Sequence, residues 1–216
     1  MRGKAIAEWT QANFKTPEGA MKVPCGYLPE QIRGIFGRLF EDVCSLNQKW
    51  SIYSKLFLDP EAAVLLDGVA RGAFNVIRES LINDMVMLLG RLCDPAIDGH
   101  GNKNVSFEAL LVKAPQLGGL KQKIDDFGAL WRPIIRKHRD KLIAHNDLRA
   151  RISPRAKPIP GIPRSQVDKM VEAANEILNY VVQQYESTEI AFDRLRETCG
   201  ADRLIFWLKK AKAAPS

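Results

Sequence analysis

Apolar residues recur every three or four positions over two long, adjacent stretches of this chain, which is the spacing of one helix face. The first stretch follows Pro29, a residue suited to the first turn of a helix, and it covers about 29–58. Its apolar positions are Ile32, Ile35, Phe36, Leu39, Phe40, Val43, Leu46, Trp50, Tyr53 and Phe57. The pattern predicts one long amphipathic helix.

The second stretch begins at Asp59–Pro60 and ends at Asp94–Pro95. Asp59 is a candidate N-cap and Pro60 suits the first turn, so this stretch predicts a second long helix. The two helices are joined by a tight connection and are expected to pack antiparallel. Three glycines inside the second helix are expected to allow close helix contact: Gly68, Gly72 and Gly90.

The rest of the chain also shows helical spacing. We expect a short helix capped by Ser106, a helix over about 120–147 with a kink at Pro133, a helix with a capping-box start at Ser165–Asp168, and a shorter helix over about 188–198. No strand-like alternation extends beyond a few residues. The predicted fold is therefore an all-α bundle of about five to seven helices.

The pattern divides the chain into three parts. Residues 1–28 form an N-terminal lead-in, residues 29–198 form the helical bundle, and residues 199–216 form a basic amphipathic tail. Docking on its own bundle is the simplest role for the tail; a partner protein or an anionic surface is the alternative.

Charge is distributed unevenly along the chain. The whole sequence of 216 residues has a net charge of +7. Residues 121–164 alone contain twelve Lys or Arg and four acidic residues, a net charge of +8. This clustering is typical of a protein with a polyanionic partner, although a solubilising patch has the same composition.

The composition also limits the class of protein. Its four cysteines form no C-x-x-C pair and no zinc-ligand spacing, so we expect no metal and no other cofactor. A metal site at Asp94, Asp98 and His100 has too few ligands and no rigid frame. The first residues have no apolar core of a secretory signal, and no apolar run reaches the length of a membrane span. We therefore expect a cytoplasmic protein without a membrane contact.

The candidate chemistry is concentrated in residues 136–147, whose sequence is RKHRDKLIAHND. This segment contains two of the three histidines, His138 and His145, and four cationic side chains, while Ile134, Ile135, Leu142 and Ile143 mark a buried side. A basic, histidine-bearing face on an anchored helix suits phosphate chemistry. A polar helix end, with His145 favourable against the helix dipole, is the alternative interpretation.

The segment resembles the R-x4–6-H signature of the HEPN superfamily, with Arg139–Asp140, His145 and then Asn146–Asp147. The abortive-infection type U branch, a phage-defence group, is the nearer resemblance. Three further features fit that branch in order: Trp50…Tyr53…Leu56–Phe57, the long apolar helix, and Arg91–Leu–Cys–Asp–Pro95 at its end. The resemblance covers roughly residues 45–190.

The resemblance implies a homodimer in which the motifs of two protomers form one composite site that cleaves RNA without a metal. His145 would transfer a proton, and Arg139 would bind the phosphate and stabilise the transition state. The supporting residues would be Asp140, Asn146, His138 and Asp94. By its position at the end of the second helix, Asp94 is a candidate to orient Arg139 or a partner base. RNA contacts are expected from Arg136, Lys137, Lys141, Arg149, Arg151, Arg155 and Lys157.

Several alternatives remain open at this stage. The protein would be a non-catalytic HEPN module if it only binds RNA, an antitoxin or another defence partner. Asp94 followed by Pro95 is also an ordinary helix stop, and Arg91 would then make only a structural ion pair or cap carbonyls. The Pro-rich basic segment 149–164 is either a path for RNA or a soluble connector.

Overall fold

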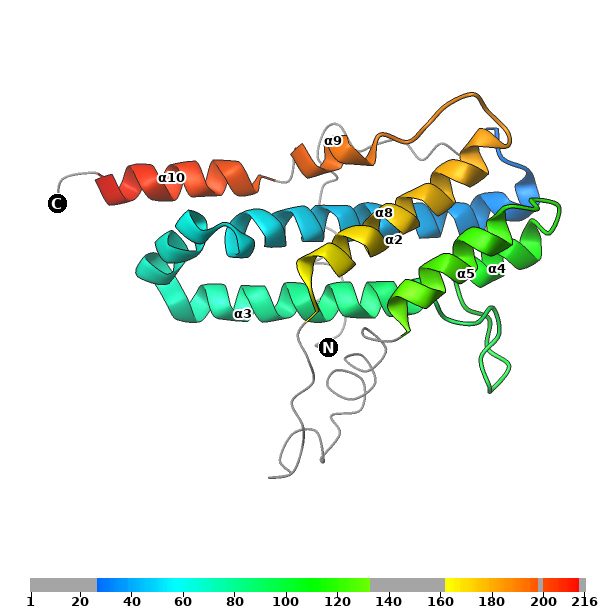
Figure 1. Cartoon of the computed structure of the whole chain (residues 1–216), viewed down its shortest axis with the longest axis horizontal. Coiled ribbons are helices and arrows are strands. Elements are labelled where there is room, and N and C mark those ends of the chain that lie inside the picture. The colour runs from blue at the N-terminus through cyan, green and yellow to red at the C-terminus, as the bar shows by residue number, and fades with distance from the viewer. Residues whose placement is uncertain (1–26, 133–161, 198–199, 214–216) are drawn as a thin grey trace, which may run out of the picture.

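The computed structural model describes residues 27–132, 162–197 and 200–213. Within these residues the chain forms seven α-helices, one π-helical turn and a single isolated bridge between Ile97 and Lys103, with no strand. Figure 1 shows that the long helices lie side by side as a bundle, while the last helix extends along one end. The predicted all-α fold is confirmed.

Helix α2 (Glu30–Tyr53) forms the central element of the bundle, and a π-helix, η1 (Ser54–Leu58), continues it. Pro29 precedes the first turn with an extended ψ of 143°, and the predicted apolar stripe is buried from Ile32 to Trp50. The long helix expected over about 29–58 is therefore confirmed, with its last five residues in π geometry.

Helix α3 (Pro60–Leu92) runs back along α2. Asp59 is its N-cap, as predicted: the carboxylate oxygen Oδ1 accepts a hydrogen bond of 2.8 Å from the backbone N–H of Ala62. Arg91 at its far end pairs with Asp42 of α2 at 3.3 Å. This ion pair joins the C-terminal end of α3 to the middle of α2, away from the connecting turn.

One expectation for α3 is wrong. Ala70 has non-helical angles (φ −159°, ψ 67°), so the helix breaks there and the apolar stripe does not continue through it. Gly68 and Gly72 lie in the open, because a Cβ built on either would meet nothing within 4 Å. The two glycines therefore bring no other helix of the described chain close to α3, although Gly90 is buried as expected.

Helices α4 (Phe107–Lys113) and α5 (Leu120–Trp131) cover the same end of the hairpin. The expected cap of α4 is confirmed, since Ser106 Oγ accepts from the backbone N–H of Ala109 at 3.2 Å. At the start of α5, the N–H of Gly119 donates to Tyr180 Oη at 3.0 Å. A Cβ at this position would lie 2.7 Å from that oxygen, so the close approach requires glycine.

Helix α8 (Arg164–Gln183) packs across α2 and α5, and α9 (Phe192–Glu197) follows it against α2. The capping box predicted at Ser165–Asp168 is wrong: α8 begins one residue earlier, after Pro163, without a side-chain cap. Asp168 is used differently, because its carboxylate accepts from Trp50 Nε1 at 2.7 Å.

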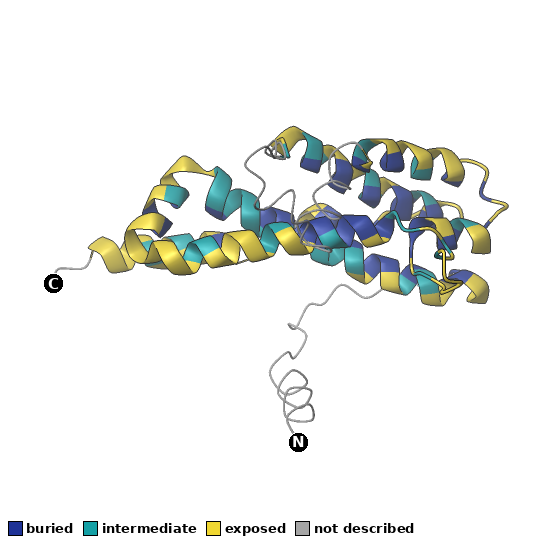
Figure 2. Cartoon of the chain, turned by 90° about the horizontal axis from the view of Figure 1, so that it is seen from below, coloured by how far each residue is buried: buried dark blue, intermediate teal, exposed yellow. Residues whose placement is uncertain are grey.

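The core has two parts. The main cluster joins α2, the second half of α3, α4, α5, α8 and α9. A smaller cluster lies at the connecting turn, where Leu56 and Leu66 contact α10 (Ala201–Ala213) through Ala201, Ile205 and Leu208. Ion pairs of Lys55 with Asp202 and of Lys209 with Glu61 also hold α10 on its own bundle. Figure 2 shows the buried residues concentrated in the main bundle and fewer toward α10.

Candidate functional site

Most residues of the predicted site lie outside the described part of the chain. This applies to Arg139 and His145, to the supporting Asp140, Asn146 and His138, and to every proposed RNA contact: Arg136, Lys137, Lys141, Arg149, Arg151, Arg155 and Lys157. Their roles remain predictions. The structure does show how the two ends of the intervening segment 133–161 are held.

Both ends of this segment leave from one place in the bundle. Trp131, at the end of α5, is 5% exposed and belongs to the main core. The side-chain amide of Gln166, in the first turn of α8, donates to the carbonyl oxygen of Leu130 at 3.0 Å. This hydrogen bond ties the last turn of α5 to the first turn of α8, so the described residues on either side of 133–161 lie next to each other.

The first turn of α8 is also anchored to α2. Trp50 is 5% exposed and donates its indole N–H to Asp168, which lies 3.7 Å from Arg164 Nε. The sequence indicated Trp50 as a core residue, but its partner, 118 positions away, has no local signal. Trp50 and Asp168 thus fix the start of α8, which follows the basic segment in the sequence.

An apolar pocket of about 310 Å³ adjoins this anchor. Its walls come from α2, the second half of α3 and the start of α8, and they include Tyr53, Ile82, Met85, Val86 and Leu89. Ile162 and Arg164, the first residues described after the segment, also line it. The described chain thus resumes at Ile162 beside this apolar pocket.

Asp94 is the one predicted site residue that the structure describes. It follows the end of α3, is partly buried, and its backbone N–H donates to the carbonyl oxygen of Arg91 at 3.1 Å. This is the helix-ending geometry expected of Asp before Pro. The proposed orientation of Arg139 by Asp94 remains a prediction, because Arg139 lies outside the described residues.

The loop after Asp94 has local polar order. Asp98 accepts hydrogen bonds from the backbone N–H groups of His100 and Asn102 and from the Asn102 side chain, at 2.8 to 2.9 Å. These hydrogen bonds, led by that from the Asn102 side chain, lower the pKa of the Asp98 carboxyl from its ordinary value. Within the described ranges, no group of three or more His, Cys, Asp or Glu side chains is arranged to hold a metal ion.

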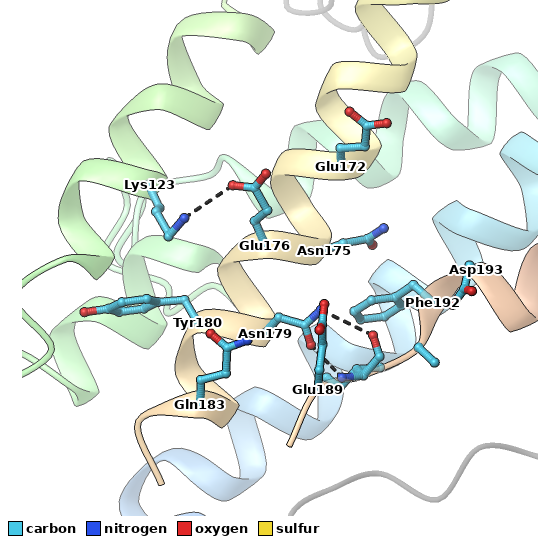
Figure 3. Close-up of a pocket in the computed structure, with 12 residues that line it drawn as sticks. Lys123, Glu172, Asn175, Glu176, Asn179, Tyr180, Gln183, Glu189, Phe192 and Asp193 are labelled. Carbon is cyan, nitrogen blue, oxygen red and sulfur yellow. Dashed lines mark hydrogen bonds and ion pairs between the residues drawn. The ribbon is translucent and has the colours of Figure 1, made fainter. Parts of the chain in front are cut away.

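A broad groove of about 640 Å³ lies between α8, α9 and the start of α5 (Figure 3). Its charged lining consists of the carboxylates of Glu172, Glu176, Glu189 and Asp193 and one cation, Lys123. Lys123 Nζ lies 3.3 Å from Glu176, so this cation is already paired. Sequence reasoning missed the groove, because it is assembled from three separate elements.

The floor of the groove is fixed by Asn179. Its side-chain oxygen accepts from the N–H of Ile190 at 2.7 Å, and its amide nitrogen lies 3.3 Å from Glu189 Oε1 and from the carbonyl oxygen of Ile190. Asn179 thereby supplies a side-chain acceptor for the N–H of Ile190, while the Ile190 carbonyl also accepts from the N–H of Phe192 at 3.0 Å. The amide is committed to structure, and the carboxylates around it would repel a phosphate backbone.

Charge is thus separated along the chain. Residues 165–193 contain six acidic side chains and one lysine, a net charge of −5, and they immediately follow the basic region 121–164. A polyanion is attracted to the basic region and repelled from the α8–α9 face. The described groove is consequently a poor RNA site, and the basic segment remains the better candidate.

None of the described helices is both long and apolar enough to cross a membrane. A comparison with family models defines the class of this chain: it is a HEPN-domain protein. The family model of AbiU2 within the HEPN group matches residues 29–199, which is most of the chain. The chain belongs to this AbiU2 family, which is linked to abortive infection.

Two further comparisons found nothing. No curated protein and no solved structure matches the chain. The matched region includes both described anchors of the basic segment, Trp131 and Asp168, and also Arg139 and His145.

Proposed function

We propose that this protein is a metal-independent endoribonuclease that acts in phage defence or in a toxin–antitoxin-like system. The observation that carries the proposal is the family match over residues 29–199, which includes the intact RDKLIAHND motif at 139–147. HEPN domains are often RNases. The charge separation supports RNA as the substrate, because the basic region 121–164 is the part of the chain that attracts a polyanion.

In the proposed reaction the 2′-oxygen of the substrate ribose attacks the adjacent phosphorus. The bond from phosphorus to the 5′-oxygen of the next nucleotide breaks, which leaves a 2′,3′-cyclic phosphate and a 5′-hydroxyl. A histidine accepts the proton of the 2′-hydroxyl, and a protonated histidine donates one to the leaving oxygen. His145 supplies this chemistry because an imidazole titrates near neutral pH.

Arg139 neutralises the charge that develops on the phosphate, because its guanidinium can donate two parallel hydrogen bonds to the oxygens. On a single helix, Arg139 and His145 would be about 120° apart and separated by about 9 Å along the axis. A two-fold dimer resolves this separation by bringing together two copies of each residue. We therefore propose that the site is composite, with Arg139 and His145 contributed by two protomers.

The proposal is tested by incubating the purified protein with a labelled mixture of tRNA and mRNA in the presence of EDTA. The wild type is expected to cleave RNA and to leave 2′,3′-cyclic phosphate ends, and His145→Ala to lose about 10²–10³-fold in rate. His100→Ala is the matched control, because His100 lies in an exposed loop. It should cleave like the wild type.

Two outcomes would overturn the catalytic proposal. Cleavage that EDTA abolishes would show a metal-dependent reaction. Equal cleavage by the wild type and His145→Ala would show that the activity does not come from this motif. RNA binding without cleavage, retained in His145→Ala, would favour a non-catalytic HEPN module instead.

A further inference from the structure

The outward side of α10 carries two large exposed rings. The helix packs on the connecting turn through Ile205 and Leu208, and it extends along one end of the bundle (Figure 1). On its other side Phe206 is 58% exposed and Trp207 is 50% exposed. The two ring centroids lie 5.4 Å apart in an edge-to-face arrangement. Aromatic rings are thus presented to solvent on a helix whose other apolar side is already buried.

Two cations lie between these rings on the helix surface. Arg203 precedes Phe206 by three residues and Trp207 by four, and Lys210 follows them by four and three, so both fall in the sector that separates the rings. Lys210 Nζ lies 5.1 Å from the centroid of the Trp207 ring, in a cation–π contact. Neither cation makes an ion pair with any residue that the structure describes. We call these four residues the aromatic-basic face of α10.

The docked side of α10 holds this face outward. Lys209 pairs with Glu61 at 3.3 Å, and Lys55 pairs with Asp202, so the helix is tied to the bundle by charge as well as by apolar contacts. Residues 203–213 contain four cations and no acid, a net charge of +4. Most of α10 is exposed, as Figure 2 shows at the end of the molecule nearest the C-terminus. A partner of this face is therefore expected to carry negative charge.

A polymer that alternates flat rings with anions suits such a face. In single-stranded nucleic acid, unpaired bases stack on aromatic side chains while phosphates contact neighbouring cations. We propose that the aromatic-basic face of α10 binds single-stranded RNA. The choice of RNA over DNA rests on the proposed function, because stacking on an aromatic ring does not depend on the sugar. Helix α10 begins at Ala201, beyond the matched residues 29–199, so the family match does not supply this contact.

Two other partners fit this face less well. An amphipathic helix binds an anionic membrane by burying one continuous apolar face. Immersion of both rings of α10 would draw Arg203 and Lys210 into the apolar layer with them. The core of a protein–protein interface is depleted in lysine, yet Lys210 lies in the middle of this face on the Trp207 ring. Rings and cations that alternate favour a nucleic acid.

Cross-linking of the full chain locates the contact directly. The probe is a single-stranded oligonucleotide of 2′-O-methyluridine that carries photoreactive 4-thiouridine; it lacks the attacking 2′-hydroxyl at the methylated positions. After irradiation and digestion with trypsin, we expect cross-links on the peptide Leu204–Lys209, which contains both rings. Cross-links found only on other peptides would overturn the proposal.

Affinity tests the stacking. We use a chain in which the four cations of 149–157 are glutamine, so that the basic segment does not mask α10. In this chain Trp207→Ala is expected to weaken binding of the single strand by about 5–150-fold, the effect of losing one stacked base. Tyr27→Ala is the matched control, because Tyr27 is 74% exposed and precedes α2; it should bind as before. Equal affinities of the two variants would overturn the proposal.

Two further probes separate RNA from other partners. The same oligonucleotide in a duplex has its bases stacked already, so Trp207→Ala should leave its binding unchanged; an equal loss for duplex and single strand would exclude stacking. Vesicles of phosphatidylglycerol and phosphatidylcholine are expected to bind the wild type and Trp207→Ala alike. Vesicle binding that Trp207→Ala abolishes, with RNA binding unchanged, would assign the face to a membrane instead.

This inference and the RNase proposal fail in different ways. If the wild type cleaves RNA but the peptide Leu204–Lys209 is never cross-linked, the function stands and the inference is wrong. If the peptide is cross-linked and Trp207→Ala weakens binding while the wild type cleaves no RNA, the inference stands and the catalytic proposal is wrong.

Discussion

Single residues show best what the sequence pattern could not provide. Trp50 belongs to a predicted apolar stripe, and the structure buries it as expected. Its hydrogen bond to Asp168 was missed, because residues 118 positions apart share no local periodicity. The same applies to Asn47 and Asn175, whose side-chain amides join α2 and α8 at 2.7 Å and 3.2 Å. Polar contacts between helices depend on tertiary packing, which a hydrophobic pattern does not specify.

Cys44 provides a residue-scale prediction. Burial on α2, with a smaller contribution from Glu41, raises the pKa of this thiol from 9.0 to about 12. Well below pH 9 the thiol is protonated in both the folded and the unfolded chain. Between pH 9 and 12 it ionises mainly in the unfolded chain, so the free energy of unfolding falls as pH rises. Urea unfolding across this range should show a shallower fall for Cys44→Ala than for the wild type.

The comparison between the two proteins isolates this thiol, since the other cysteines, lysines and tyrosines are common to both. An identical dependence on pH in the wild type and Cys44→Ala would contradict the raised pKa. The folded wild type should also react with a thiol reagent at Cys44 more slowly than its unfolded chain, because the thiolate is the reactive form.

At the scale of elements, periodicity predicted the long helices well. Apolar spacing predicted the extents of α2 with η1 and of α3. Turn residues predicted the caps at Asp59 and Ser106. The break at Ala70 could not be predicted, because alanine favours helix and Ala70 itself is exposed. The start of α8 was misplaced because Asp168 accepts from Trp50 instead of serving a capping box.

The N-cap of α3 gives a prediction about the stability of the fold. Asp59→Ala removes the acceptor for the Ala62 N–H and is expected to lower the free energy of unfolding by about 0.5–2 kcal/mol. Asp67→Ala is the control, because Asp67 lies inside α3 and makes an exposed ion pair with Arg71 at 3.1 Å. Such a pair contributes about 0.2–0.5 kcal/mol. Equal losses for the two variants in urea denaturation would show that the cap has no special role.

At the scale of the whole molecule, the separation of charge connects fold to function. The acidic groove on α8 and α9 and the basic region 121–164 lie next to each other in the sequence, and α8 packs directly on α5. The sequence alone predicted the excess of basic residues, the family and the all-α fold. The arrangement of Arg139 and His145 stays a prediction, because it depends on residues outside the described ranges and on a second copy.

The basic segment gives a prediction about RNA affinity. Replacing Arg149, Arg151, Arg155 and Lys157 by glutamine is expected to weaken RNA binding and to flatten its dependence on salt. The slope of log K against log salt should fall by about 0.7 for each phosphate of single-stranded RNA that the variant no longer neutralises. Neutralising Arg38 and Arg71, whose side chains are 68% and 71% exposed on α2 and α3, is the control. Equal slopes for the two variants would exclude a specific role of the segment.

The central claim is a composite RNase site made by two protomers, and mixing two inactive variants tests it most directly. Arg139→Ala and His145→Ala are each expected to lose about 10²–10³-fold in cleavage rate in EDTA. After the two are unfolded and refolded together, the mixed dimers retain one Arg139 and one His145, and cleavage with 2′,3′-cyclic phosphate ends should exceed that of either variant refolded alone. A mixture no more active than its parents, beside an active refolded wild type, would contradict the composite site.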